Sequence, residues 1–211
     1  MTRGPDSARR LDIGSSARTM LPIEFRGEEV MLEARAYQGK DETTQAMALI
    51  NRGQGAAAAE IPLVRVHSGC VTGDIFHSLR CDCRAQLEGA LERIVKTPNG
   101  VLIYLPYHEG RGIGLVNKIK AYALQDDGLD TVDANIELGE PIDARDYQLA
   151  AEILLDLAMT RIRLMTNNPA KVEALRAQGI EVVDREPLIV RPSPHNERYL
   201  DTKRRRMSHK L

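Results

Sequence analysis

Hydrophobic positions in the first part of the chain follow the two-residue period of β-strands. The pattern predicts strands at Glu28–Tyr37 and Ala46–Ile50, followed by a buried strand at Pro62–His67. A stretch rich in Gly and Ala at 53–59 separates the second of these from the third and predicts a hairpin or loop. Residues 1–20 are rich in Ser, Arg and Gly and have no period, so we expect a disordered lead-in there.

Helical spacing and short apolar runs alternate along the rest of the chain. Ala85–Val95 carries apolar residues at helical spacing, and Val101–Leu105 is a short apolar run bounded by Gly100 and Pro106, which is typical of a buried strand. The further predicted elements are helices at 113–125 and 144–158, a strand at 161–166, a helix from Asn168-Pro169 to Gly179, and strands at 182–183 and 188–190. This alternation predicts an α/β layer on a mixed sheet.

No repeat or convincing linker divides the chain, which is long enough at 211 residues to bury one core. We expect a single α/β domain (α+β, mixed sheet) over residues 21–190, with a β-rich first section and helices packed on the sheet. We expect residues 191–211 to form a basic tail, with a short helix from Tyr199. Its cluster Lys203–Arg206 is typical of a solvated charge run.

Composition excludes several classes of function. Aromatic residues make up 4% of the chain and Trp is absent, and the formal net charge is −1, so neither stacking nor charge favours a nucleic-acid-binding protein. No apolar run is long enough to span a bilayer, and the N-terminal residues have no apolar core of a secretory signal. We therefore expect a cytoplasmic protein without a membrane partner.

The three cysteines, Cys70, Cys81 and Cys83, have the spacing C-x10-C-x-C. An odd number in one short stretch does not make a disulfide framework, whereas three thiolates suit zinc. A missing fourth protein ligand favours a catalytic site, but His67 or His77 could complete a closed structural site, and inert buried cysteines are a weaker third reading. If the backbone is extended, Cys81 and Cys83 point to the same side.

Several motifs in order carry a resemblance to a known family. They are RVHSGCVTGDIFHSLRCDCRAQL from Arg65, EGRGIGLVNKIKAYALQDDGLDTVDAN from Glu109, DARDYQLAAEIL from Asp143, LMTNNPAKVEAL from Leu164 and NERYLDTK from Asn196. Together they resemble GTP cyclohydrolase II, the first committed enzyme of riboflavin synthesis, over roughly residues 60–207. A lone C-x-C motif would not be specific.

The resemblance implies a chemistry for particular residues. The cysteines match the family's zinc ligands, whose metal activates water for attack at C8 of guanine, with ring opening and release of formate. Tyr122 matches a tyrosine of the ring chemistry, although its spacing alone favours a core position on a helix. Asp143 and Arg145 match the base and the nucleophile for loss of pyrophosphate. By its chemistry Arg145 is better suited to clamp phosphate. The alternative for Asp143 is a structural role as the N-cap of a helix.

The resemblance also implies a nucleotide site. Glu109, Gly110 and Arg111 match a stretch that contacts the nucleotide, in a glycine pattern that is not a P-loop, so GTP would be a substrate. The other matching contact positions are Arg65, Gln86, Thr131, Thr166 and Lys171. Magnesium is expected with the triphosphate, held partly by its oxygens, and the family implies a homodimer.

The chain departs from the family pattern at a few positions. Gly69 stands where the family usually has Glu, Tyr107-His108 where it has Arg-Gln, Arg84 where Gly is common, and Ser208 where it has Gly. Lost hydrogen-bonding partners can change discrimination strongly. Three alternatives therefore stay open: another purine nucleotide as substrate, a reaction that stops at the formylated pyrimidine, and an inactive zinc-stabilised guanine-nucleotide-binding protein. His108 is either a solvated loop residue or a group that serves phosphate or base.

Overall fold

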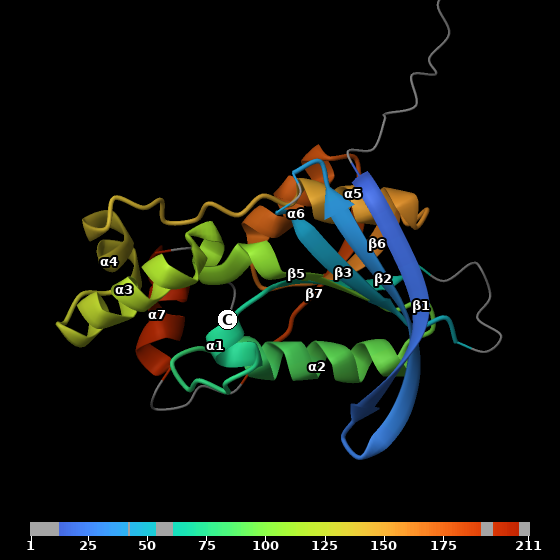
Figure 1. The fold of residues 1–211 in the computed structure, drawn as a ribbon, viewed down its shortest axis with the longest axis horizontal. Helices are drawn as coiled ribbons and strands as arrows, with labels where there is room; N and C mark the ends of the chain where they lie inside the picture. Colours follow the sequence, from blue (N-terminus) through green and yellow to red (C-terminus); the bar gives the residue numbers. More distant parts are fainter. Residues whose placement is uncertain (1–12, 42, 54–60, 191–195, 207–211) are drawn as a thin grey trace, which may run out of the picture.

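The computed structural model describes residues 13–41, 43–53, 61–190 and 196–206. Its centre is a seven-stranded sheet in the order β1-β2-β3-β5-β4-β6-β7 (Figure 1). The strands are β1 (Ile13–Phe25), β2 (Glu28–Gly39), β3 (Gln45–Ile50), β4 (Leu63–Ser68), β5 (Val101–Leu105), β6 (Arg161–Met165) and β7 (Glu181–Glu186). Strands β1, β2, β3 and β5 pair antiparallel, while β5, β4, β6 and β7 pair parallel. The predicted mixed α/β sheet is confirmed.

Strand β1 corrects the expected disordered lead-in. Residues 13–20 belong to this edge strand and pair with β2 across a two-residue turn, in which Arg26 and Gly27 both have positive φ, 56° and 82°. Most of its side chains between residues 14 and 20 are exposed. Residues 14–20 are therefore held in the strand by the backbone ladder and not by an apolar face, which is why the hydrophobic pattern missed them; the apolar contacts of β1 come from Leu21 and Ile23, which pack against the core under α2. Residues 1–12 of the predicted lead-in lie outside the described residues.

Helices cover both faces of the sheet (Figure 1). They are α1 (Val71–Asp74), α2 (Cys83–Lys96), α3 (Gly114–Asp126), α4 (Thr131–Glu137), α5 (Gln148–Asp156), α6 (Pro169–Ala177) and α7 (Glu197–Arg206), with a 3-10 segment η1 at Pro106–Gly112. One core lies under α5 and α6, and a second under α2. Alternate residues of β5 serve the two cores, since Ile103 faces the first and Leu102 the second.

Some helix boundaries differ from the prediction. The predicted helix at 144–158 is shorter, because residues 143–146 form an irregular segment before α5. Helix α4 was not predicted; it begins where the Asp130 carboxylate accepts hydrogen bonds from the N–H groups of Val132 and Asp133. Residues 188–190 form no strand.

Residues 197–206 of the predicted basic tail form helix α7, where a short helix was expected from Tyr199, and Arg204–Arg206 are exposed as the charge run predicts. The Arg206 guanidinium donates to the Asp130 and Asp133 carboxylates of α4 at 2.6 and 2.8 Å. The loop predicted at 53–59 and the end of the tail at 207–211 fall largely outside the described residues. Within the described ranges, no helix is long and apolar enough to cross a membrane.

The order of the parallel strands predicts where a ligand binds. The chain leaves β4 for β5 on one side, and later adds β6 on the other side of β4. The carboxyl ends of β5, β4 and β6 therefore meet at one edge, where the connections diverge and leave a crevice.

Candidate active site

A cavity occupies this edge of the sheet. It comprises about 1020 Å³ of space, including its mouth open to solvent. The ends of β4, β5 and β6 and the inner face of α3 surround it. The predicted site residues that line it are Arg65, Cys70, Cys81, Cys83, Gln86, Gly110, Arg111, Tyr122, Thr131, Arg145, Thr166 and Lys171. Glu109 and Asp143 stand behind this lining.

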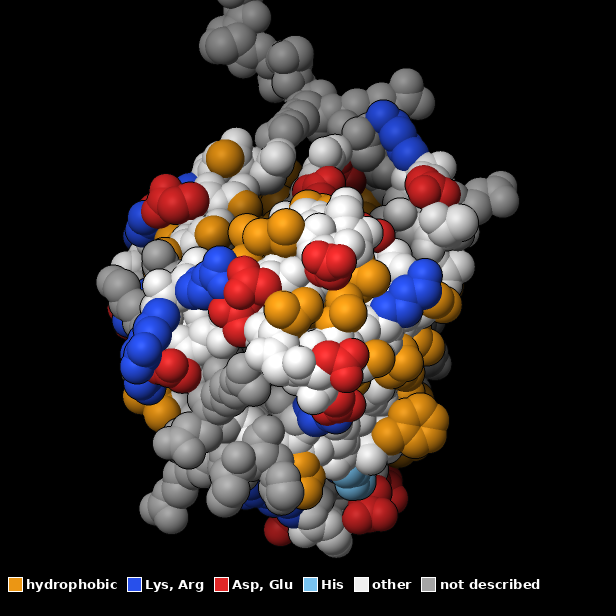
Figure 2. Space-filling model, turned by 90° about the vertical axis from the view of Figure 1, so that its left-hand side faces the viewer, with side chains coloured by type: hydrophobic (Ala, Val, Ile, Leu, Met, Phe, Trp, Pro, Cys, Tyr) orange, Lys and Arg blue, Asp and Glu red, His pale blue; other side chains and the backbone are white. Residues whose placement is uncertain are grey.

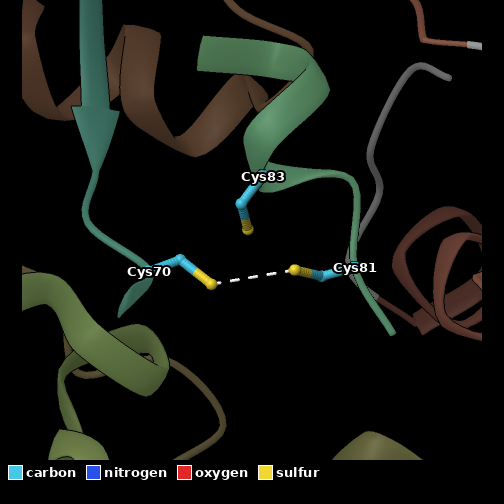
Figure 3. Close-up of side chains that lie close together, drawn as sticks. All are labelled: Cys70, Cys81 and Cys83. Carbon is cyan, nitrogen blue, oxygen red and sulfur yellow. Dashed lines mark hydrogen bonds between the residues drawn. The ribbon is translucent and has the colours of Figure 1, made fainter. Parts of the chain in front are cut away.

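The three cysteines converge on one point of the cavity wall (Figure 3). Cys70 follows β4, Cys81 lies in the loop after α1, and Cys83 begins α2. The sulfur atoms of the three lie within 4.8 Å of one another, and those of Cys70 and Cys81 are 3.7 Å apart. The segment from Cys81 to Cys83 is a bend leading into a helix, so the condition of an extended backbone is not met, although the sulfurs still meet.

Neither histidine near the cluster joins it. Among the described residues, the group able to hold a metal ion consists of the three cysteines alone. His67 Nε2 instead contacts the Asp74 carboxylate at 3.1 Å, and His77 is exposed on its loop. Among the described residues, the cluster therefore offers three sulfur ligands, which is the number of protein ligands in catalytic zinc sites. The donor set fits zinc.

Gly73 makes this convergence possible. A Cβ atom at residue 73 would lie 2.8 Å from the Cys81 sulfur and 3.2 Å from the Cys70 sulfur. Its N–H group also donates to the Cys70 sulfur at 3.4 Å, as part of the cap of α1. The sequence pattern did not single out Gly73, because its role depends on the packing of three sulfurs around it.

Lys118 is a second functional residue that the motifs did not single out. Its ammonium donates to the Cys70 sulfur at 3.0 Å and to the Glu109 carboxylate at 2.5 Å. Burial disfavours the ammonium, but Tyr122 and Glu109 outweigh it and raise the pKa of Lys118. Its spacing of four residues from Tyr122 on α3 was the available signal, because such residues share a helix face.

The thiols of the cluster divide their protons unequally. Contacts with Cys81 and Cys83, together with the Lys118 cation, lower the pKa of Cys70 far below that of a free thiol. The contact with the Cys70 sulfur raises the pKa of Cys81 to about 11. Since a metal ion binds thiolates, it would displace the remaining protons. The thiolates would then carry several negative charges close together, and the Lys118 ammonium offsets one of them.

Glu109, which the resemblance assigns to the stretch that contacts the nucleotide, lies behind the cavity lining. Its second carboxylate oxygen accepts a hydrogen bond from the Val71 N–H at 2.5 Å, while the first holds Lys118. The adjacent Gly110 and Arg111 do line the cavity, with positive φ of 61° and 63°. Glu109 therefore braces the turn after β5 against the cysteine loop.

Asp143 and Arg145 form a tight pair. Arg145 Nε and Nη2 donate to the two carboxylate oxygens of Asp143 at 2.8 and 2.5 Å. Burial favours the neutral acid, but the Arg145 guanidinium holds the pKa of Asp143 below its usual value. Helix α5 begins only at Gln148, so Asp143 is not the N-cap that its position suggested. The pair presents a fixed guanidinium to the cavity.

Positive charge dominates the cavity wall. Its charged lining residues are Arg65, Arg111, Lys118, Arg145 and Lys171, and the described lining contains no carboxylate. Arg65 is 5% exposed and donates to the Met165 carbonyl and to Gln86. Burial lowers the pKa of Arg65 to about 10, so it stays charged at neutral pH. Such a wall favours an anionic ligand.

The remaining predicted residues reach the cavity from three helices and one strand end. Tyr122 comes from α3 and lines the cavity. The Arg80 guanidinium lies over the Tyr122 ring, 5.0 Å from the ring centre. Tyr122 is half-buried, so it is not the core residue that its spacing favoured. Thr131 begins α4, Gln86 lies on α2, and Thr166 follows β6. Asn167 and Asn168, which the motif analysis did not assign, line the same rim after β6.

The packing of the two strand ends explains why residue 69 is a glycine. A Cβ atom there would lie 2.9 Å from Cα of Pro106 and 3.0 Å from the carbonyl oxygen of Leu105. Its N–H group also donates to that carbonyl at 2.9 Å. The backbones at the ends of β4 and β5 are therefore too close for the Glu of the usual pattern.

The chain is therefore an α/β protein with a candidate metal site, the cysteine cluster, beside a cavity lined by cations. Both lie where the connections of the parallel strands diverge. The sequence matches the family model of GTP cyclohydrolase II over residues 15–187, and the chain belongs to this family. The family recognised from the motifs is thereby confirmed.

Related proteins cover most of the chain. It is 51% identical over 177 residues (83% of the chain) to the riboflavin biosynthesis protein RibBA of Salinispora tropica. It is 57% identical over 147 residues (70%) to RibBA of Aquifex aeolicus, and 58% identical over 147 residues (70%) to GTP cyclohydrolase-2 of Archaeoglobus fulgidus. The aligned parts span 43%, 36% and 39% of these relatives, respectively. The chain thus matches less than half of each relative's length.

Replacing Gly73 with alanine tests the packing of the cluster. We expect Gly73→Ala to push the sulfurs apart and to lower the zinc content measured by mass spectrometry of the native protein, with all three ligands still present. The matched control is Gly89→Ala on α2, whose new methyl group would touch only Leu188 at 3.4 Å. Equal zinc content in both variants would refute this role of Gly73.

Restoring the family's usual residue at position 69 tests the reason given for Gly69. We expect Gly69→Glu to lower the free energy of unfolding by about 1–3 kcal/mol, because its Cβ atom forces the two strand ends apart. Chemical denaturation measures the change. Gly69→Ala should show most of it, since the clash begins at Cβ. A Gly69→Glu variant as stable as the parent would contradict the close packing.

Proposed function

We propose that this chain hydrolyses GTP. The proposed products are formate, pyrophosphate and 2,5-diamino-6-(5-phosphoribosylamino)pyrimidin-4-one. The observation that carries the proposal is the juxtaposition of three convergent sulfurs with a cavity wall of five cationic side chains and no described carboxylate. The names of the relatives, GTP cyclohydrolase-2 and RibBA, support the same reaction and a role in riboflavin synthesis.

The cations account for substrate binding in this proposal. Arg65 and Lys171 are both buried. Lys171 Nζ lies 5.3 Å from the centre of the Tyr147 ring and donates to the Val66 carbonyl at 2.7 Å, while Arg65 donates to the Met165 carbonyl at 3.0 Å. Held in this way, they lose little freedom when they meet phosphate oxygens. Magnesium would arrive with the triphosphate, since the described lining offers amide and hydroxyl groups but no carboxylate to hold it.

Two parts of the site divide the chemistry. Zinc held by Cys70, Cys81 and Cys83 would activate the water that opens the imidazole ring. Tyr122 faces the same cavity and would exchange a proton with the ring as the bonds to C8 are cleaved, two waters being consumed before formate leaves. At the triphosphate a further water replaces the pyrophosphate leaving group. There Arg145, fixed by Asp143, would stabilise the developing charge, which suits a guanidinium better than nucleophilic attack.

A homodimer is part of the proposal, on the strength of the family resemblance. Hydrophobic side chains are exposed on the outer side of α3 and on the loop after α1, and Figure 2 shows hydrophobic groups gathered on this side of the molecule. The exposed residues there are Ile75, Phe76, Leu79, Leu115, Val116 and Ile119. Such a surface favours contact with another protein.

Incubation of the zinc-loaded protein with GTP and magnesium tests the proposed reaction. We expect formate and pyrophosphate in equal amounts and, by mass, a diaminopyrimidine ribotide without a formyl group. Cys81→Ser should lose zinc and formate release together. A product that keeps the formyl group would show an early stop. No turnover of GTP would refute the proposed substrate, and no turnover of other purine nucleotides would then favour a binding protein.

A further inference from the structure

His108 is a departure from the family pattern that the proposed reaction leaves without a role, and it lines the cavity. It is 1% exposed and lies in η1, directly after β5. The rings of Tyr107 and Tyr147 meet it edge to face, with ring centres 4.5 and 5.2 Å away. These contacts fix the plane of the imidazole. Each of its two nitrogen atoms has a hydrogen-bond partner, Ser68 for Nδ1 and the Asp146 carbonyl for Nε2.

The partners of the imidazole set the direction of its hydrogen bonds. Nε2 lies 2.6 Å from the carbonyl oxygen of Asp146, which can only accept, so Nε2 carries the proton. Burial lowers the pKa of His108 to about 3, so the ring is neutral and holds one proton only. Nδ1 is therefore an acceptor, and it receives the hydroxyl proton of Ser68 at 3.1 Å.

The Ser68 hydroxyl links His108 to Arg145 through hydrogen bonds. Because its proton is used toward His108, its oxygen presents lone pairs, and Arg145 Nη1 donates to it at 3.4 Å. The other edge of the same guanidinium is held by Asp143. A chain of hydrogen bonds thus runs from Arg145 through Ser68 and His108 to the Asp146 carbonyl, one residue beyond Arg145.

We propose that His108 is a positioning residue that holds Arg145 against the triphosphate, through the Ser68 hydroxyl on one side and the backbone of Asp146 on the other. This inference rests on the proposed function, in which Arg145 acts at the phosphates. His108 closes a loop between the end of β5 and the segment at 143–147, which is otherwise irregular. Both its nitrogens are engaged, so it orients the guanidinium and does not itself accept a proton from the substrate.

Three variants measure this role. His108→Phe keeps a ring but removes both hydrogen bonds, and we expect kcat for pyrophosphate release to fall about ten- to hundredfold, as for a misplaced catalytic group, with KM for GTP changed less than about threefold. His108→Gln offers an amide N–H and a carbonyl oxygen, and should restore most of kcat. The control is His77→Phe at an exposed loop position, which should leave kcat unchanged. Equal kcat values for His108→Phe and the parent would overturn the proposal, and so would failure of His108→Gln to restore activity lost in a folded His108→Phe.

Nitrogen-15 NMR of the histidine rings separates this inference from the proposed reaction. At neutral pH the His108 signal, identified by its loss in His108→Gln, should be that of a neutral ring protonated at Nε2. Ser68→Ala should shift the resonance of Nδ1 by removing its hydrogen bond. Both results are expected even if GTP is not the substrate. A charged ring, a proton on Nδ1, or no response to Ser68→Ala would overturn the proposal whatever the activity.

Discussion

The approach of three cysteine sulfurs at the carboxyl end of β4 is the constraint on which the rest of the site depends. Sulfur atoms within 4.8 Å of one another concentrate negative charge once they ionise. The surrounding chain adapts to this: Gly73 omits a side chain, and Lys118 places an ammonium 3.0 Å from the Cys70 sulfur. Asp74 accepts the Cys70 N–H at 3.0 Å, which fixes the start of the loop. The loop is therefore built around the cluster.

The same constraint organises the wall of the cavity. Lys118 needs Glu109 as its second partner, and Glu109 in turn binds the Val71 N–H, so the turn after β5 is tied to the cysteine loop. That turn carries Arg111 and His108 into the cavity wall. Lys118 and the turn that carries Arg111 are thus held by the framework that holds the sulfurs, so the cysteine cluster and this part of the cation-lined wall form one structure.

The sequence predicted most of this site because its chemistry lies in contiguous motifs. The strand at Val101–Leu105 and the helix start at Asn168-Pro169 were confirmed, since an apolar run and a cap are local signals. The three-cysteine cluster was predicted from spacing alone, although the chain between Cys81 and Cys83 is a bend that leads into α2 and not an extended segment. The first half of β1 escaped prediction because the side chains of residues 14–20 are exposed and show no apolar period.

Other features depend on contacts between distant residues, and no local pattern encodes them. Lys118 meets Cys70 across 48 positions, and His108 meets Ser68 across 40. In the motif, Gly69 stands where the family usually has a glutamate, so the sequence suggests only a lost carboxylate. The structure explains the glycine by the close approach of Pro106. Such roles follow only when the strand order has brought the ends of β4 and β5 together.

X-ray absorption at the zinc edge tests the central claim most directly, since it counts the atoms bound to the metal in the loaded protein. Three sulfur neighbours and one lighter atom that is exchanged when a nucleotide binds would support an open, three-cysteine site. A fourth ligand from the protein, such as an imidazole that stays bound in the presence of nucleotide, would contradict it and make the cluster a closed structural site.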